Sequence, residues 1–104
     1  MITVLKFYAP WCGPCRTLSE RLEGVTGITE VNIENDMELA IKYHVRKIPV
    51  VVFLKGNKEV HREVGLFTRF HFDATMQELN DKHGLDEIDV VDPKIVKQDE
   101  ESNL

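Results

Sequence analysis

The chain has 104 residues, of which 42% are hydrophobic and 30% charged, a composition that fits one small globular domain and excludes a multi-domain protein. Residues 1–84 hold 11 Lys and Arg against 11 Asp and Glu, so the net charge of -5 comes from residues 85–104. Without a basic cluster, nucleic acid is not expected as a ligand. The longest nearly continuous apolar stretch, residues 48–54, is far shorter than the roughly 20 residues that span a bilayer, which excludes a transmembrane helix.

The first elements are predicted from the spacing of apolar side chains and glycines. Residues 2–8 are rich in branched and aromatic side chains without alternation, which is typical of a strand covered on both faces, although Lys6 interrupts them. Residues 13–23 place two leucines four positions apart among charged side chains, as one face of a helix does. Residues 28–33 alternate in the manner of a second strand.

The middle of the chain predicts a short helix. Asn35 followed three positions later by Glu38 is a variant of the capping-box pattern. Leu39 and Tyr43 then recur at helical spacing, so the helix is expected to end near His44.

A hairpin and a last helix follow. Residues 50–54 predict a buried strand, residues 56–57 (Gly-Asn) a tight turn, and residues 59–64 its antiparallel partner. Thr68 is a candidate cap for a helix over residues 69–83, which carries apolar side chains along one face.

In chain order these elements are β-α-β-α-β-β-α, an α/β fold. A strand, a crossover helix and a second strand form a right-handed parallel unit, and the hairpin can extend the same sheet. This predicts a four-stranded mixed sheet flanked by three helices on both faces. Because Gly84 follows the last predicted helix, the domain is expected to span residues 1–84. Residues 85–104 are expected to be an acidic tail, flexible or loosely docked.

The chemistry is concentrated in Cys12 and Cys15, two cysteines separated by Gly13 and Pro14 at the start of a predicted helix. A thiol at a helix N-terminus lies near unpaired backbone N–H groups and the positive end of the macrodipole, which lower its pKa from about 8.5. Cys12 is expected to be the exposed thiolate and Cys15, one turn further, the buried thiol. Cys12 would attack a substrate disulfide, and Cys15 would then attack Cys12 to release the reduced substrate.

A metal site is the main alternative for a Cys-x-x-Cys pair, because half of a zinc site has the same spacing. Zinc would need two further ligands. The chain has no other cysteine, and its four histidines show no paired spacing, so no metal is expected.

The segment around the cysteines resembles the thioredoxin family. Residues 7–16 read Phe-Tyr-Ala-Pro-Trp-Cys-Gly-Pro-Cys-Arg, which is similar to that family's active-site segment. Residues 46–50 read Arg-Lys-Ile-Pro-Val, which is similar to its cis-proline loop, and residues 53–65 are similar to the hairpin that follows. The resemblance covers about residues 2–83. The Gly-Pro dipeptide resembles reducing thioredoxins more than glutaredoxins or disulfide-forming oxidases.

This resemblance implies roles for the matched residues. Cys12 is the nucleophile, Cys15 the resolving thiol, and Pro49 a cis-proline beside the disulfide. The residues implied in substrate binding are Trp11, Gly13, Pro14, Ile48, Pro49 and Gly65. As alternatives, Trp11 could only pack and Gly65 could only end a strand.

Two features depart from the family. Typical thioredoxins have a further strand and helix before the active-site strand, so we expect the shorter core, as in glutaredoxins, with one sheet edge exposed or covered by the tail. Lys6 also stands where the family usually has a buried Asp, and Glu30 where it has the partner Lys. If the charges are exchanged, Glu30 would accept the proton of Cys15 while Lys6 keeps the carboxylate ionised or favours a thiolate. The alternative is that Lys6 extends into solvent and Glu30 is solvated.

We therefore expect a cytoplasmic, monomeric dithiol-disulfide oxidoreductase without a bound cofactor, which reduces protein disulfides and is re-reduced by a flavoprotein of the thioredoxin-reductase type. One alternative is a glutaredoxin-like enzyme that uses glutathione, for which Arg16, Arg46 and Lys47 could provide a basic rim. Another is a docking subunit of a larger enzyme, with the redox chemistry incidental. No membrane partner is expected.

Overall fold

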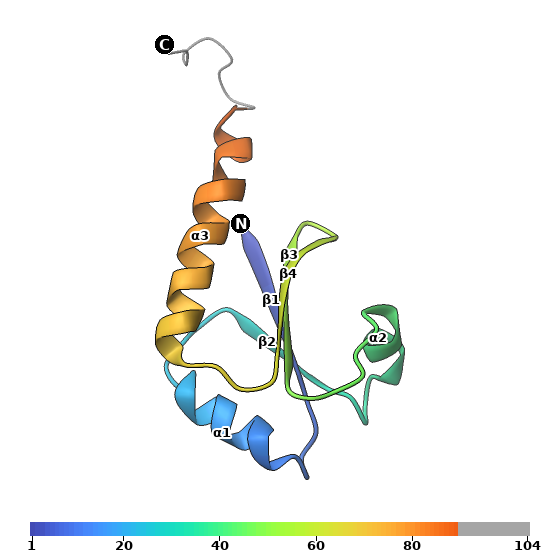
Figure 1. Cartoon of the computed structure of the whole chain (residues 1–104). Helices are drawn as coiled ribbons and strands as arrows, with labels where there is room; N and C mark the ends of the chain where they lie inside the picture. The colour runs from blue at the N-terminus through green and yellow to red at the C-terminus, as the bar shows by residue number, and fades with distance from the viewer. Residues whose placement is uncertain (90–104) are drawn as a thin grey trace.

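The computed structural model describes residues 1–89 of the chain. It has seven elements in the predicted order (Figure 1): β1 (Ile2–Tyr8), α1 (Gly13–Arg21), β2 (Ile28–Asn32), α2 (Met37–Lys42), β3 (Val50–Lys55), β4 (Lys58–Val64) and α3 (Arg69–Asp89). No helix in this part of the chain is both long enough and apolar enough to cross a bilayer.

The four strands form one mixed sheet in the order β2-β1-β3-β4, as predicted. β1 is parallel to β2 and antiparallel to β3, and β3 is antiparallel to β4. In the parallel pair Lys6 lies directly beside Glu30. β1 is therefore an inner strand, and the cysteine pair follows its C-terminal end.

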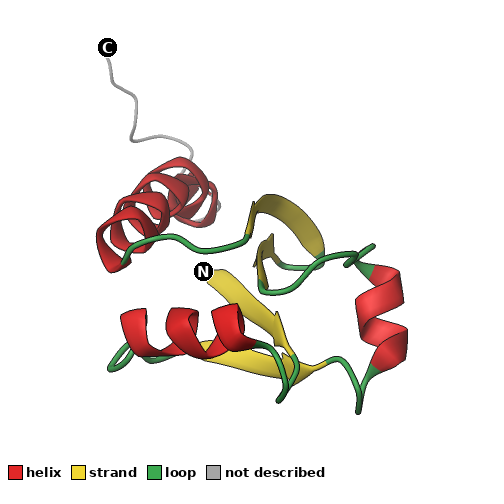
Figure 2. Cartoon of the chain, turned by 60° about the horizontal axis from the view of Figure 1, so that its bottom comes forward, coloured by secondary structure: helices red, strands yellow, loops and turns green. Residues whose placement is uncertain are grey.

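β1 and β3 contribute side chains to two separate cores, one on each face of the sheet. Val4 and Phe53 belong to a buried cluster that includes Leu18 of α1, Leu22 just after it and Phe72 of α3. Phe7 and other β1 and β3 side chains belong to a second cluster, which α2 completes with Ala40. The helices thus cover both faces of the sheet (Figure 2), and this explains why β1 and β3 lack a polar alternation.

Local capping fixes where the helices begin. Thr68 caps α3 as predicted, because its Oγ1 accepts a hydrogen bond from the N–H of His71 at 3.0 Å. The predicted cap of α2 is wrong by one residue: Asp36, not Asn35, accepts the N–H of Leu39, at 3.1 Å. Both side chains are of types that cap helices, so the sequence pattern alone does not distinguish them.

Two helices end elsewhere than predicted. α1 stops at Arg21, two residues early. α3 continues through Gly84 to Asp89, so the predicted boundary at residue 84 falls inside a helix. A glycine within a helix costs only about 1 kcal/mol relative to alanine, and the helix formers Leu85 and Glu87 follow it. The remainder of the predicted tail, residues 90–104, lies outside the described residues.

α2 ends at Lys42 because the chain closes a Schellman motif just after it. The N–H of His44 donates to the carbonyl of Ile41 at 3.0 Å, and the N–H of Val45 donates to that of Ala40 at 2.9 Å. His44 takes the left-handed conformation that this motif requires, with φ 56°.

Replacing His44 with glycine is expected to raise the free energy of unfolding by about 1 kcal/mol, because glycine adopts a positive φ without steric cost. Urea denaturation of the purified protein would measure the change. His44→Ala keeps the strained conformation and serves as the control. Equal midpoints for His44→Gly and His44→Ala would contradict the explanation.

Candidate active site

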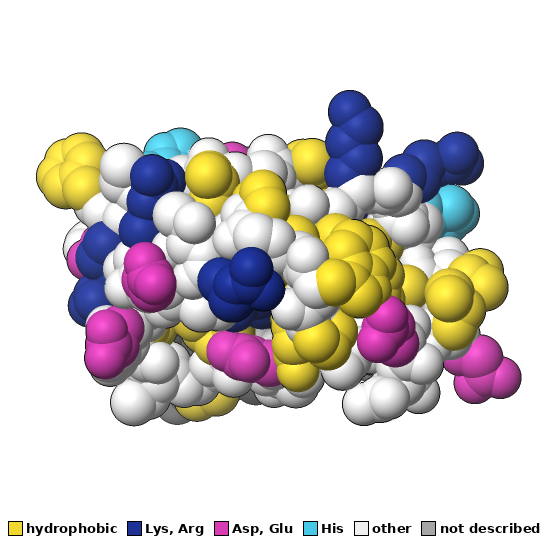
Figure 3. All heavy atoms as spheres, turned by 90° about the horizontal axis from the view of Figure 1, so that it is seen from below, with side chains coloured by type: hydrophobic (Ala, Val, Ile, Leu, Met, Phe, Trp, Pro, Cys, Tyr) yellow, Lys and Arg dark blue, Asp and Glu magenta, His cyan; other side chains and the backbone are white. Residues whose placement is uncertain are grey.

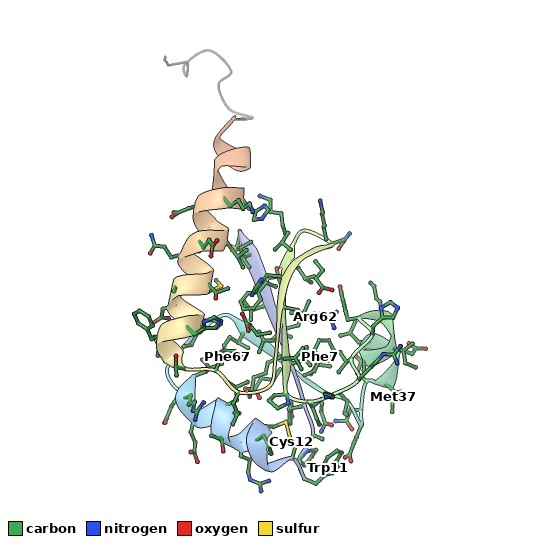
Figure 4. All side chains as sticks on the ribbon, in the orientation of Figure 1. Phe7, Trp11, Cys12, Met37, Arg62 and Phe67 are labelled. Atoms are coloured by element: carbon green, nitrogen blue, oxygen red, sulfur yellow. A yellow bond between two sulfur atoms is a disulfide. The ribbon has the colours of Figure 1, made fainter. Side chains whose placement is uncertain are left out.

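Cys12 and Cys15 are joined by a disulfide, with their Cα atoms 5.2 Å apart. The bond lies where the chain leaves β1 and enters α1, at the same end of the molecule as Trp11 (Figure 4). Within residues 1–89, no three His, Cys, Asp or Glu side chains are grouped to hold a metal ion. The two sulfur atoms are bonded to each other, which is the oxidised state of a dithiol pair.

Cys12 is the N-cap of α1, which places its sulfur at the positive end of the helix. Its Sγ accepts a hydrogen bond from the backbone N–H of Cys15 at 3.2 Å. Pro14 lies in the first turn, where its missing N–H leaves no intrahelical bond unmade. When the disulfide is reduced, the same N–H and the helix macrodipole favour a thiolate on Cys12.

The expectation that Cys12 is exposed is wrong for this disulfide-bonded state. Cys12 is 5% exposed and Cys15 is 2% exposed. Tyr8 and Ile48 pack against the cluster that the two cysteines form with Ala9. A substrate can therefore reach Cys12 only at a narrow part of its surface.

The loop before β3 lies against the disulfide. The Ile48–Pro49 peptide is cis, as the resemblance implies. The carbonyl oxygen of Ile48 is 4.0 Å from the Sγ of Cys12, and Pro49 is buried. Gly65, at the end of β4, has φ +93° and donates its N–H to the carbonyl of Pro49 at 2.9 Å. The structure thus brings Cys12, Ile48, Pro49 and Gly65 together from three separate segments.

Trp11 is 66% exposed, so packing does not explain its position. Its indole Nε1 donates a hydrogen bond to Glu34 Oε2 at 2.6 Å. The backbone N–H of Glu34 donates to the side-chain Oδ1 of Asn32 at 2.9 Å, and this bond holds the start of the loop between β2 and α2 in place. Sequence reasoning missed Glu34, because no local pattern connects it to a residue 23 positions earlier.

Lys6 and Glu30 form the predicted pair of opposite charges. Lys6 Nζ is 3.4 Å from Glu30 Oε2, and the side chain of Lys6 is 2% exposed whereas that of Glu30 is 55% exposed. Lys6 also donates to the hydroxyl of Ser19 and lies 5.7 Å from the ring centre of Tyr8. The alternative in which Lys6 extends into solvent is therefore wrong. Ser19 was missed, although its position one helical turn after Cys15 was a signal available in the sequence.

A hollow of about 380 Å³ opens beside β2, and neither cysteine lines it. Its walls include Tyr8, Glu30 and Asn32 from the sheet, Leu39 from α2 and Asp36, the N-cap of that helix. Since neither cysteine lines it, we do not assign the hollow to substrate binding, although Glu30 in its wall pairs with Lys6.

Glu63 of β4 binds two histidines at the same carboxylate oxygen. His61 Nε2 is 2.7 Å and His71 Nε2 is 2.8 Å from Glu63 Oε2, which ties β4 to the first turn of α3. Partial burial raises the pKa of Glu63, but hydrogen bonds from His71 and His61 outweigh it and hold the pKa below its usual value.

Because the folded pKa of Glu63 is depressed, its stabilising contribution is present above the unfolded pKa near 4.5 and is lost as the pH falls through the folded value. Glu63→Gln is expected to cost about 1 kcal/mol of unfolding free energy at pH 7 and much less at pH 3. Denaturant titrations at the two pH values would measure this. Glu20→Gln, an exposed carboxylate, is the control. A Glu63→Gln cost that is the same at both pH values would contradict the assignment.

A disulfide at the N-terminus of a helix, on a mixed sheet covered on both faces, defines the class of dithiol-disulfide oxidoreductases. The family model described as Thioredoxin matches residues 1–78. The chain belongs to the thioredoxin family and is a thiol-disulfide oxidoreductase of that family.

Individual proteins agree with this assignment. Thioredoxin 1 of Nostoc sp. is 30% identical over 81 residues, which are 71% of this chain and 76% of that protein. The mitochondrial thioredoxin of Mus musculus is 34% identical over 83 residues, which are 73% of this chain and 50% of that longer protein. The chain thus spans about half the length of this mitochondrial relative.

Solved structures show the same fold. A mutant thioredoxin from Halobacterium salinarum has a TM-score of 0.69 at 26% identity, covering 74% of this chain and 73% of that one. Fasciola hepatica thioredoxin has a TM-score of 0.63 at 31% identity, and the match covers 79% of this chain and 80% of that one. The predicted thioredoxin fold is confirmed.

Proposed function

We propose that this protein reduces disulfides of other proteins with the Cys12/Cys15 dithiol. The observation that carries the proposal is the position of Cys12, which caps α1 and lies 4.0 Å from the carbonyl oxygen of Ile48. This places the nucleophile beside the loop that would hold a substrate.

The reaction proceeds in two exchange steps. The Cys12 thiolate attacks one sulfur of the substrate disulfide, forming a mixed disulfide while the other substrate sulfur leaves as a thiolate and takes up a proton. Cys15 then loses its proton and attacks Cys12, which breaks the mixed disulfide and releases the second substrate thiol. The substrate gains two electrons and two protons, and the enzyme is left as the Cys12–Cys15 disulfide.

Exposed Trp11 and half-buried Ile48 offer apolar contacts on two sides of Cys12. Gly13 and Gly65 have no side chain that would hinder a substrate backbone, and Pro14 and Pro49 keep the two flanking segments rigid. These six residues are the proposed substrate surface.

Lys6, Glu30 and Ser19 are proposed to assist the second step. The buried ammonium of Lys6 contacts Ser19, one helical turn from Cys15, and favours the anionic form of that thiol. Glu30 balances the charge of Lys6 and, being 55% exposed, can take up the released proton and pass it to water.

The proposed activity is tested by insulin reduction with two electron donors. NADPH with a flavoprotein thioredoxin reductase is expected to sustain turnover, and glutathione alone is expected to be much slower. Faster turnover with glutathione would favour the glutaredoxin-like alternative. A variant with both cysteines replaced by serine should be inactive; if it still supports the function of a partner enzyme, the protein is a docking subunit instead.

A further inference from the structure

Three cationic residues lie next in sequence to the segments that hold the disulfide: Arg16 of α1 follows Cys15, and Arg46 and Lys47 precede Ile48 in the loop before β3. All three are exposed. Viewed from the end that carries the disulfide, the molecule shows Lys and Arg side chains on different sides of an apolar patch, with Asp and Glu side chains on the same face (Figure 3). A substrate that approaches Cys12 contacts this face of the molecule.

None of the three cations forms an ion pair in the part of the chain that the structure describes. Two of the carboxylates have other partners. Glu34 accepts the indole N–H of Trp11, and Glu59 holds Arg62 through two hydrogen bonds of 2.6 and 2.8 Å. Arg16 contacts only a carbonyl, that of Pro10, at 2.9 Å. No ion pair therefore neutralises these three cations within the described residues, although Glu34 keeps its negative charge beside Trp11.

The backbones of Lys47 and Arg16 are close to the reacting sulfur. Lys47 precedes Ile48, so their Cα atoms are about 3.8 Å apart, and the Ile48 carbonyl is 4.0 Å from Cys12 Sγ. Arg16 lies one turn into α1, where its backbone N–H donates to the carbonyl of Cys12 at 3.3 Å. The N-terminus of α1 adds a partial positive charge between them. The field at Cys12 favours anionic groups in the approaching substrate.

We propose that the preferred substrates are protein segments whose disulfide is flanked by Asp or Glu, which Arg46, Lys47 and Arg16 bind. The inference rests on the proposed function, because it names the substrate class of the same site. The carboxylates take no part in the exchange, and the electrons and protons move between sulfur atoms as described above. The preference is therefore expected in KM rather than in kcat.

The test uses three synthetic peptides of equal length with one intramolecular disulfide, flanked by Glu, Gln or Lys. With the reduced full-length protein, kcat/KM is expected to fall from Glu to Gln to Lys by roughly threefold per charge, the range of exposed ion pairs. Raising the salt concentration from about 0.05 to 1 M should remove most of the difference in kcat/KM between the three peptides, because the Debye length shortens to about 3 Å.

Arg46→Gln combined with Lys47→Gln should reduce the Glu-to-Lys ratio several-fold, whereas Lys58→Gln, at the β3–β4 turn, should preserve it. An unchanged ratio in the double variant, or equal rates for the three peptides, would overturn the inference while leaving the proposed function intact. Failure to reduce even the Gln peptide or insulin would overturn the proposed function and this inference with it. Glutathione disulfide serves as a separate arm: if it outcompetes the Glu peptide, the cations bind the tripeptide rather than protein segments.

Discussion

Cys12→Ser is expected to abolish disulfide reduction, whereas Cys15→Ser is expected to retain attack and accumulate the protein covalently bound to its substrate. Serine cannot form the thiolate that starts the exchange, so the first variant has no nucleophile. The second variant keeps Cys12 at the cap of α1 but lacks the thiol that releases the substrate. We expect a loss of at least 10³-fold in turnover for both, since no other cysteine can substitute.

The two variants are distinguished by non-reducing electrophoresis and mass spectrometry after mixing with oxidised insulin. Only Cys15→Ser should give an adduct, and added dithiothreitol should release it. Thr17→Ser, in the same helix, is the control and should turn over normally. An adduct on Cys15 in the Cys12→Ser protein, at a similar rate, would show that the two roles are reversed.

Lys6→Met is expected to slow the resolving step several-fold at pH 7. The ammonium contacts Ser19, whose Cβ lies roughly 6 Å from that of Cys15 at helical spacing. A nearby positive charge favours the thiolate, and Glu30, 3.4 Å from Lys6 Nζ, offsets part of that effect. Without the charge, a smaller fraction of Cys15 is ionised at neutral pH, and the rate should recover as the pH rises.

Stopped-flow measurement of mixed-disulfide decay between pH 6 and pH 10 would test this. Lys6→Met should shift the rate profile to higher pH, and Glu30→Gln should slow decay without abolishing it, because water can replace an acceptor that is 55% exposed. Lys82→Gln, an exposed lysine of α3, is the control. Lys6→Met should fold, since methionine fits an apolar strand and removes a buried charge. An unshifted profile in a folded Lys6→Met protein would restrict Lys6 to a structural role.

The fold was largely predictable because its signals are local. β1 and β3 are nearly continuous apolar runs, and glycine-containing turns separate the strands of the hairpin. The errors lie at helix ends. Asn35 and Asp36 are adjacent capping types, and only tertiary contacts select between them. Gly84 has the conformational freedom to end a helix but does not have to do so.

The site was predictable in part for the same reason. Cys12 and Cys15 are three residues apart, so their relation to α1 follows from the sequence. The Lys6–Glu30 pairing required the register of β1 and β2, which the resemblance supplied. The bond from Trp11 to Glu34 and the burial of Cys12 depend on segments that are distant in sequence, and no periodicity encodes them.

The most direct test of the account is the rate of alkylation of Cys12 in the reduced protein as a function of pH, followed with iodoacetamide and peptide mapping. The account predicts that Cys12 reacts as a thiolate near neutral pH, with an apparent pKa well below the value of about 8.5 for a free thiol. A titration indistinguishable from that of an unstructured peptide containing the same residues would contradict it.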